Sequence, residues 1–335
     1  MPIDTFFDVM GMFAASMGDD CTYCHVKEAV FDHAQFATPT PRIQRARQMI
    51  GMTQALNRQY FGGRPRISCF TCHRGDYQPV NAPRLALQYG VPDEDPNVIN
   101  FPTDDELMPD QIFDKYVAAI GGPAALAKVT SFVAKGTYSG FDTGHDELPV
   151  EIYAKAPNQR TWMITFTEGD SYRVFDGMNA WFAGPDSPAP IVTLQSGNLD
   201  RYRIAAALAF PAGIKQLYKE WRAGRTVIDG NDVIVLQGTT PGLLPVNFYF
   251  DDKSGLLVRV VRWNETAVGW VPTELNYDDY RDVGGIKMPF TWTATQTYMQ
   301  MTIKLREIAP NLPVEPSRFA KPAPGKPARP GDARP

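Results

Sequence analysis

Two short motifs use every cysteine in the chain, and in each a histidine follows the second cysteine directly. They are Cys21-Thr22-Tyr23-Cys24-His25 and Cys69-Phe70-Thr71-Cys72-His73. The C-x-x-C-H pattern is the attachment signature of c-type haem. Each thiol forms a thioether with a haem vinyl group, and the histidine ligates the iron from the proximal side. The sequence therefore predicts two haem c groups, with His25 and His73 as proximal ligands and four thioether links, at Cys21, Cys24, Cys69 and Cys72.

A structural zinc site is the first alternative for a chain with two C-x-x-C pairs, because Cys and His side chains bind zinc tetrahedrally. Zinc does not require a histidine directly after the second cysteine, whereas haem attachment does, and the full pattern occurs twice. A redox-active dithiol or a pair of disulfides would leave both histidines unexplained. Haem attachment is the interpretation that accounts for all six residues.

The length and composition predict a folded chain of two domains rather than a disordered one. The chain has 335 residues, of which 44% are hydrophobic. Its formal charge of -4 argues against nucleic acid as a partner. The expected partners are redox donor and acceptor proteins, whose identity the sequence does not indicate.

Covalent haem attachment predicts the compartment. In bacteria this reaction takes place outside the cytoplasmic membrane, so we expect a periplasmic or extracellular location. The first residues, Met1-Pro2-Ile3-Asp4, do not read as a secretory signal. We therefore expect an export signal that the chain as given does not contain. No apolar run of about 18 residues suggests a transmembrane helix.

Each motif follows a helix that carries methionines. Residues 5–17 predict a short helix with Met10 and Met17 on its apolar side, ended by Gly18, and residues 43–60 predict a longer one that ends before Gly62 and Gly63. This order is an internal repeat and predicts a two-haem module. Most methionines at helical spacing pack in a core, but beside a haem motif a thioether is a candidate axial ligand.

With these features in place, residues 5–80 resemble the cytochrome c subunit of the photosynthetic reaction centre, a family in which a Met-bearing helix precedes each haem motif. The resemblance rests on Met10, on Gly18 to His25, on Ala46-Arg47-Gln48-Met49 with Met52-Thr53 and Asn57, and on Cys69 to Gly75. It implies Met10 and Met49 as distal iron ligands. Met12 and Met52 stand on the same helices and remain alternatives.

Two departures limit what the resemblance implies. The photosynthetic subunit usually carries four haems, whereas this chain has cysteines for two. One haem of the family has a distal histidine, but the matching stretch around 59–64 contains none. The resemblance therefore supports a two-haem electron-transfer module rather than photosynthesis.

Basic residues are concentrated in the same module. Arginine pairs well with carboxylates, and haems bring propionates, so we assign Arg47 and Arg74 as propionate contacts. The two histidines outside the motifs, His33 and His145, lie in polar loop or turn sequence and are expected to be solvated rather than ligands.

The rest of the chain predicts a different architecture. Residues 81–109 are rich in proline and are expected to form a linker, and residues 316–335 a flexible tail. Between them, residues 110–315 alternate short runs of aromatic and β-branched residues with Gly, Pro, Asn and Asp turns, apart from a helical stretch at 199–220. The whole is thus expected to be α+β, with a helical di-haem module at 1–80 followed by a mainly antiparallel β domain with helices.

The β domain loosely resembles the bacterial outer-membrane lipoprotein-carrier fold, a curved sheet that forms a half-barrel closed by helices. The resemblance rests on the strand and turn pattern, including Tyr277-Asp278-Asp279-Tyr280-Arg281 before Gly284-Gly285. It implies a cavity that either holds an acyl chain or a peptide, or is filled by side chains. We expect filling by Trp162, Phe175 and Trp181.

Taken together, the sequence predicts an electron-transfer protein rather than an enzyme. An iron with histidine on one side and methionine on the other has no open position for a small molecule, so two such low-spin haems exchange electrons. One alternative is a di-haem peroxidase-type enzyme with one open haem. Another is a cytochrome subunit whose β domain assembles it into a larger, membrane-associated or multi-subunit electron-conducting complex.

Overall fold

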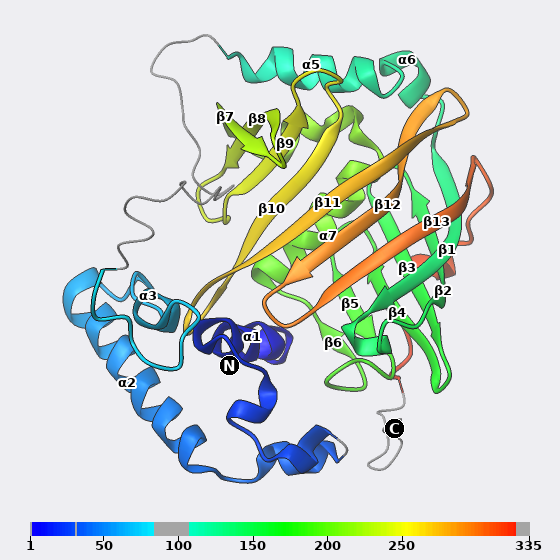
Figure 1. Cartoon of the computed structure of the whole chain (residues 1–335). Helices are drawn as coiled ribbons and strands as arrows, with labels where there is room; N and C mark the ends of the chain where they lie inside the picture. The colour runs from blue at the N-terminus through cyan, green and yellow to red at the C-terminus, as the bar shows by residue number, and fades with distance from the viewer. Residues whose placement is uncertain (1, 31, 84–106, 326–335) are drawn as a thin grey trace.

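The computed structural model describes residues 2–30, 32–83 and 107–325. Most of the expected linker at 81–109 and the last ten residues of the expected tail lie outside these ranges. Within them the chain is α+β, as the sequence predicts: helices come first and a large antiparallel sheet follows (Figure 1). No helix in the described ranges is both long and apolar enough to cross a membrane.

The N-terminal part consists of two main helices and short helical turns. These elements are η1 (Ile3–Thr5), α1 (Phe6–Met17), η2 (Cys21–Tyr23), η3 (Lys27–Val30), η4 (His33–Ala37), α2 (Pro41–Phe61) and α3 (Cys69–His73). Helix α2 begins at Pro41 because Thr40 caps it, with the Thr40 hydroxyl accepting a hydrogen bond from the Ile43 N–H at 3.2 Å. Both α1 and α2 end at glycines in the left-handed conformation, Gly18 and Gly62.

A single sheet of thirteen strands makes up most of the remaining chain. The strands are β1 (Ser131–Gly140), β2 (Leu148–Lys155), β3 (Gln159–Phe166), β4 (Gly169–Phe175), β5 (Ala180–Ala183), β6 (Val192–Thr193), β7 (Glu220–Ile228), β8 (Asn231–Thr239), β9 (Val246–Asp251), β10 (Leu257–Thr266), β11 (Gly269–Val283), β12 (Ile286–Gln296) and β13 (Gln300–Pro310). Their order is β6-β5-β4-β3-β2-β1-β13-β12-β11-β10-β9-β8-β7. Every neighbour along the sheet is also a neighbour in sequence except the central pair β1 and β13.

The two edges of the sheet are joined by a helical crossing. After β6 the chain forms α7 (Ser196–Ala209) and η6 (Pro211–Leu217), then enters the opposite edge as β7. Helix α7 packs against β3, β4 and β10, so it lies across one face of the curved, unclosed sheet (Figure 1). Gly197 permits this approach, because a Cβ there would lie 2.6 Å from the Asn264 side-chain oxygen on β10.

The main core lies between this face of the sheet and its covering helices. Strand β12 shows how the sequence directs it: Met288, Phe290, Trp292 and Ala294 alternate with more exposed residues, so one face is buried. Helices α5 (Pro109–Ala119) and α6 (Pro123–Leu126) add a second cover, and Phe113 of α5 contacts Trp221 and Phe250 edge to face.

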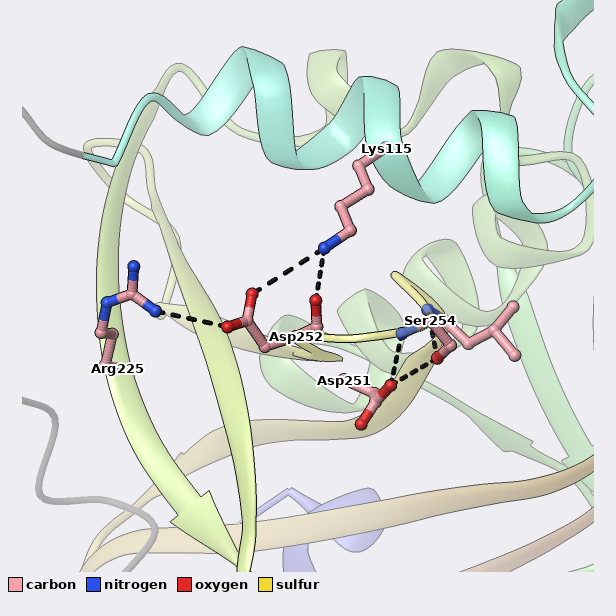
Figure 2. A network of polar contacts seen from close by, with 6 residues as sticks. Lys115, Arg225, Asp251, Asp252 and Ser254 are labelled. Atoms are coloured by element: carbon pink, nitrogen blue, oxygen red, sulfur yellow. Dashed lines mark hydrogen bonds and ion pairs between the residues drawn. The ribbon is translucent and has the colours of Figure 1, made fainter.

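Polar contacts hold α5 to the turn between β9 and β10. Lys115 donates a hydrogen bond to the Asp252 carbonyl and lies 3.8 Å from its carboxylate, which is also 3.6 Å from Arg225 of β7 (Figure 2). The same turn is closed by Asp251, whose carboxylate accepts hydrogen bonds from the N–H and hydroxyl of Ser254, each at 2.6 Å. These pairs are partly exposed and orient α5 more than they stabilise it.

The segment after β13 is partly packed. The turn η7 (Pro316–Phe319) lies against β3, where the Thr161 hydroxyl donates a hydrogen bond to the Arg318 carbonyl at 2.7 Å. Phe319 is 2% exposed and packs with Tyr153 and Val314. The first residues of the expected tail at 316–335 are therefore anchored by one buried aromatic side chain.

Trp162, Phe175 and Trp181 do not fill one cavity together, and that expectation is wrong. Phe175 packs in a separate cluster with Ala180, Val192, Leu194 and Ala206, and Trp181 is not part of it. Trp162 instead lines a cavity of about 140 Å³ between α7 and the sheet. The physical reason is register: Phe175 ends β4, beside β5, whereas Trp162 lies mid-strand in β3.

Helix α1 is docked on the tips of two β hairpins. Val9 and Met12 pack with Val268 and Val271 at the β10–β11 tip, and Phe7 stacks on Tyr298 in the β12–β13 turn with ring centroids 5.6 Å apart. Gly11 faces that second turn so closely that a Cβ would lie 2.3 Å from the Thr297 hydroxyl. The helical module is thus fastened to the sheet through α1.

A buried polar network reinforces this docking. The Asp8 carboxylate of α1 accepts hydrogen bonds from the side-chain amides of Asn198 and Asn264, at 3.1 and 2.6 Å. Asn198 also donates to the Asp4 carbonyl at 2.7 Å. All three residues of the Asp8 network are less than 9% exposed, so each needs these partners.

We predict that Asp8→Ala lowers the free energy of unfolding by roughly 2–3 kcal/mol, because two buried amide donors lose their acceptor. Chemical denaturation of the haem-loaded protein measures the change. Asp146→Ala is the matched control, since Asp146 is exposed and its loss should cost little. A loss at Asp8 no larger than that at Asp146 would contradict the role of the network.

Candidate haem-attachment sites

The first motif is shaped by its own turn. The Asp20 carboxylate accepts hydrogen bonds from the N–H and the hydroxyl of Thr22, both at 2.7 Å, and so caps η2. These bonds hold the pKa of Asp20 below its usual value. The His25 N–H then bonds to the Cys21 carbonyl at 3.0 Å, which completes one tight turn from the first thiol to the histidine.

The start of α2 holds the first motif from the other side. The Thr40 hydroxyl donates to the Cys24 carbonyl at 2.6 Å, and Arg42 donates to the Tyr23 carbonyl at 2.6 Å. The Arg42 guanidinium also lies 4.2 Å from the centre of the Tyr23 ring. Thr40 and Arg42 are positioning residues that the sequence reasoning missed, although the Thr40-Pro41 pair is a recognisable start signal for a helix.

The second motif forms a helix of its own. Cys69–His73 is α3, and the Ser68 N–H donates to the Thr71 hydroxyl at 3.0 Å in a capping box. Arg74 then takes a left-handed conformation with φ of 54°, and Gly75 follows with φ of 82°. The chain returns over the motif, where the Val80 N–H bonds to the Cys72 carbonyl at 2.8 Å.

Both motif histidines are oriented by the same kind of contact. His25 Nδ1 lies 3.0 Å from the Phe36 carbonyl, and His73 Nδ1 lies 3.0 Å from the Asp76 carbonyl. A carbonyl can only accept, so each bond places the proton on Nδ1 and leaves Nε2 with its lone pair for a metal. Histidines that ligate metals are usually held in this way by a carbonyl or carboxylate on the other nitrogen.

The four cysteines are free thiols, with Cys69 buried and Cys21 and Cys72 exposed. Burial raises the pKa of Cys21, Cys24 and Cys69, which keeps them protonated at neutral pH. In the described residues no three His, Cys, Asp or Glu side chains converge, as a zinc site would need. Two separate thiol pairs, each beside an oriented histidine, fit haem attachment.

The end of α1 brings the two motifs together. The Gly75 N–H, just after the second motif, bonds to the Ser16 carbonyl at 3.1 Å. Gly18, just before the first motif, approaches the same residue so closely that a Cβ would lie 2.2 Å from the Gly75 carbonyl oxygen. Gly18 is therefore needed both for its left-handed conformation and for this contact.

The four candidate methionines differ in their surroundings. Met12 is 6% exposed in the contact with the β10–β11 tip, and its sulfur lies 3.7 Å from the Ser16 hydroxyl. Met10 is half-buried at the edge of the same cluster. On α2, Met49 is half-buried and Met52 is 45% exposed.

The arginines of the module are largely unpaired. Arg47 and Arg74 are both exposed. Among the described residues, neither forms an ion pair, and the same holds for the neighbouring arginines Arg42, Arg45, Arg58, Arg64 and Arg66. Such a group of cations has no carboxylate partner of its own in the described part of the chain.

Apolar surface is also concentrated here. Of sixteen exposed large hydrophobic residues in the described ranges, nine belong to the first 80 residues: Ile3, Phe6, Phe7, Val30, Met52, Tyr60, Phe61, Phe70 and Tyr77. Helix α2 is also poorly covered, because only two of its 21 residues, Thr53 and Asn57, are buried. A flat apolar macrocycle on each motif would cover surface of this kind, so the residues present fit the predicted group.

Asn57 is a further residue whose role the sequence reasoning missed. Its side-chain oxygen accepts hydrogen bonds from the N–H groups of Arg66 and Ile67 at 3.0 and 2.9 Å, and its amide donates to the Ile67 carbonyl at 2.7 Å. Asn57 is 8% exposed. A single side chain on α2 thus shapes the loop that leads into the second motif.

Comparison with known proteins identifies the N-terminal part. Residues 3–91 match the family model described as the photosynthetic reaction centre cytochrome C subunit. The match covers both C-x-x-C-H motifs and both Met-bearing helices, and it confirms the resemblance expected from residues 5–80. It supports a c-type cytochrome role for this part of the chain.

Comparison with solved structures returns likenesses at low sequence identity. A LolA superfamily protein from Nitrosomonas europaea aligns with 64% of this chain and 98% of its own, at 13% identity and a TM-score of 0.43. An outer membrane lipoprotein-sorting protein domain from Vibrio parahaemolyticus covers 63% and 95%, at 11% identity and a TM-score of 0.41. A DUF1329 family protein from Desulfovibrio piger covers 63% and 96%, also at 11% identity and a TM-score of 0.41.

We predict that Asn57→Ala destabilises the protein by roughly 1–3 kcal/mol, because the loop N–H groups at 66 and 67 lose their acceptor. Asn57→Asp, which keeps an acceptor but loses the donor to Ile67, should cost less. Both are measured by thermal or chemical unfolding. Equal stability of Asn57→Ala and the unaltered protein would show that the loop does not depend on this side chain.

Proposed function

We propose that this chain is an electron-transfer protein with two c-type haems, one on each C-x-x-C-H motif, each ligated by a histidine and a methionine. The observation that carries the proposal is the paired orientation of His25 and His73, each with Nδ1 bound to a carbonyl and Nε2 left free beside two free thiols. When bound, the haems supply a reversible one-electron iron couple. The match of residues 3–91 to a cytochrome family supports the same role.

Met10 and Met49 are the proposed distal ligands. Met12 is committed to the hydrophobic contact with Val268 and Val271, and its removal from there would open a cavity. Met52 is the more exposed of the two methionines on α2. A haem held by one histidine and one methionine would have no open position for peroxide or oxygen, so this ligand set would favour electron transfer over peroxidase-type catalysis.

Arg47 and Arg74 are proposed to hold haem propionates. Both are exposed and neither has an ion-pair partner in the described residues. Arg42 is less suited to this role, because its guanidinium already bonds to the Tyr23 carbonyl. Arginine forms bidentate bonds to carboxylates, so two such residues suffice to orient the propionates.

The remaining assignments follow from covalent haem. We propose a periplasmic or extracellular location, and redox proteins as electron donor and acceptor, with a membrane-associated or multi-subunit complex as the setting. In this arrangement residues 1–80 form the di-haem module, 81–109 the linker, and 110–315 the β domain that carries the module through α1.

We predict two covalently attached haems per chain. Mass spectrometry of the intact chain together with a pyridine haemochrome assay measures this number. Replacement of Cys69 and Cys72 by alanine should leave one haem, because the first motif retains its own thiols and histidine. A chain that carries no covalent haem when produced with a haem-attachment system would contradict the proposal.

We predict that Met10→Leu and Met49→Leu each lower the reduction potential of one haem by on the order of 0.1 V, because axial ligands set haem potentials over roughly 0.8 V. Met12→Leu and Met52→Leu are the matched controls and should leave both potentials in place. Met12→Leu should cost less than about 1.5 kcal/mol of stability, as a swap of similar volume in a packed site.

A redox titration followed by visible absorption measures these potentials. A fall in potential with Met12→Leu or Met52→Leu, and none with the partner on the same helix, would reassign the ligand. Tight cyanide binding to the unaltered protein would instead indicate an open haem position.

A further inference from the structure

The cavity between α7 and the sheet has an unusual lining. It holds about 140 Å³ and is lined by residues of α5, α7, β1 to β4 and β10 to β13. Most of its wall is apolar or aromatic, including Trp162, Leu275, Met288, Trp292 and Ile308. Four arginines also line it, and three of them come from three different elements: Arg160 of β3, Arg201 of α7 and Arg262 of β10.

These three arginines have no carboxylate partner. Among the described residues, no Asp or Glu oxygen lies within 4.0 Å of any of their guanidinium groups, and Arg160 Nε has no hydrogen-bond acceptor. Arg173, which lines the same cavity, shows the usual arrangement, with Asp186 at 2.7 Å. A cation withdrawn from water without a carboxylate partner lowers the stability of the fold, so three such arginines around one cavity call for an explanation.

The charges remain at neutral pH. Burial lowers the pKa of Arg160 to about 10, and burial together with the charge of Arg201 lowers that of Arg262 to about 9. Arg262 is 6% exposed and therefore little hydrated. Both side chains stay protonated near pH 7 and face the cavity as cations.

One carboxylate offsets only part of this charge. Asp8 acts on Arg201 and Arg262 through its field, but it already accepts hydrogen bonds from Asn198 and Asn264. These three arginines and Asp8 together carry a net charge of +2. Tyr277 also lines the cavity, where burial raises its pKa and the charges of Arg160 and Arg262 lower it.

The aromatic side chains define the shape of the remaining space. The Trp162 and Trp292 rings lie 6.0 Å apart, and the Arg160 guanidinium lies 5.1 Å and 5.9 Å from their centres. An engineered cavity of roughly 150 Å³ accepts benzene, so about 140 Å³ has room for one aromatic ring. The cavity thus has room for one aromatic ring, with apolar side chains on most of its wall and arginine side chains on the rest.

We propose that this cavity binds a small aromatic carboxylate, with its carboxylate on Arg160 and Arg262 and its ring against Trp162 and Trp292. Arginine recognises carboxylates by bidentate hydrogen bonds, which here would also give Arg160 Nε an acceptor and both guanidinium groups a carboxylate partner. Few, precisely placed polar groups in an apolar pocket are the usual basis of ligand selectivity. The site lies apart from the haem motifs and does not rest on the proposed electron transfer.

Isothermal titration calorimetry of the haem-loaded full chain tests the proposal, with benzoate as the probe. Benzyl alcohol has the same ring without the charge and should bind at least tenfold more weakly. Decanoate has the charge without the ring and should also bind more weakly than benzoate. Absence of benzoate binding, or binding of benzyl alcohol or decanoate as tight as that of benzoate, would overturn the proposal.

Two variants locate the site. Arg262→Gln and Arg160→Gln should each weaken benzoate binding at least tenfold, whereas Arg306→Gln should not change it. Arg306 is the matched control because it is exposed on β13, next to Leu305, which lines the cavity. Benzoate binding unchanged in both cavity variants would place the site elsewhere and contradict the proposal.

Thermal unfolding separates a ligand-binding role from a structural one. Without ligand, Arg262→Gln should unfold at the same temperature as the unaltered protein or higher, because an unpaired buried charge is removed. Benzoate should raise the unfolding temperature of the unaltered protein but not of the variant. A large drop in unfolding temperature for both cavity variants, with the benzoate-induced rise retained, would mean that the arginines serve the fold alone.

Discussion

The docking of α1 on the hairpin tips is the contact on which the rest of the arrangement depends. One face of this helix is buried against β10–β11 and β12–β13, with Gly11 needed for the closest approach. Its end holds Gly75 after the second motif and leads through Gly18 directly into the first. The helix thus links the sheet to both C-x-x-C-H motifs. Because α1 is packed against the sheet, the positions of the two motifs relative to the sheet depend on this one helix.

Buried polar groups fall into two classes in this protein, and the contrast explains their roles. In the Asp8 network the carboxylate accepts from two buried side-chain amides, as expected for groups that hold two parts of a fold together, although the Asn264 side-chain oxygen has no partner. Arg160, Arg201 and Arg262 have no carboxylate partner in the described residues, although Arg173 shows that the same face can supply one. A fold gains nothing from unpaired buried cations, whereas a ligand site requires groups whose partner arrives from outside.

Local pattern predicts what depends on local sequence, and fails where distant segments meet. The motifs, the end of α1 at Gly18 and the strand β1 at 131–140 all follow from residue type and period. Strand β7 begins at Glu220, the residue at which the expected helical stretch 199–220 ends, and it is an edge strand whose first residues mix charged, aromatic and small side chains without clear alternation. The pairing of β1 with β13 and the partners of Asp8 involve separations of more than a hundred residues, and the cavity arginines come from three separate elements, so no local pattern encodes them.

The two pairs of candidate methionine ligands, one on α1 and one on α2, differ in whether their two members point the same way. Met10 and Met12 are two residues apart, so their side chains leave α1 roughly 200° apart. Once Met12 is packed on the β10–β11 tip, Met10 must point away from the centre of that contact, and the docking of α1 supports Met10 as the ligand. Met49 and Met52 are three residues apart and share a face of α2, so rotation does not separate them. There the preference for Met49 rests on the family resemblance and on its greater burial, and the reduction potential of the haem proposed on the second motif is the quantity that distinguishes the two.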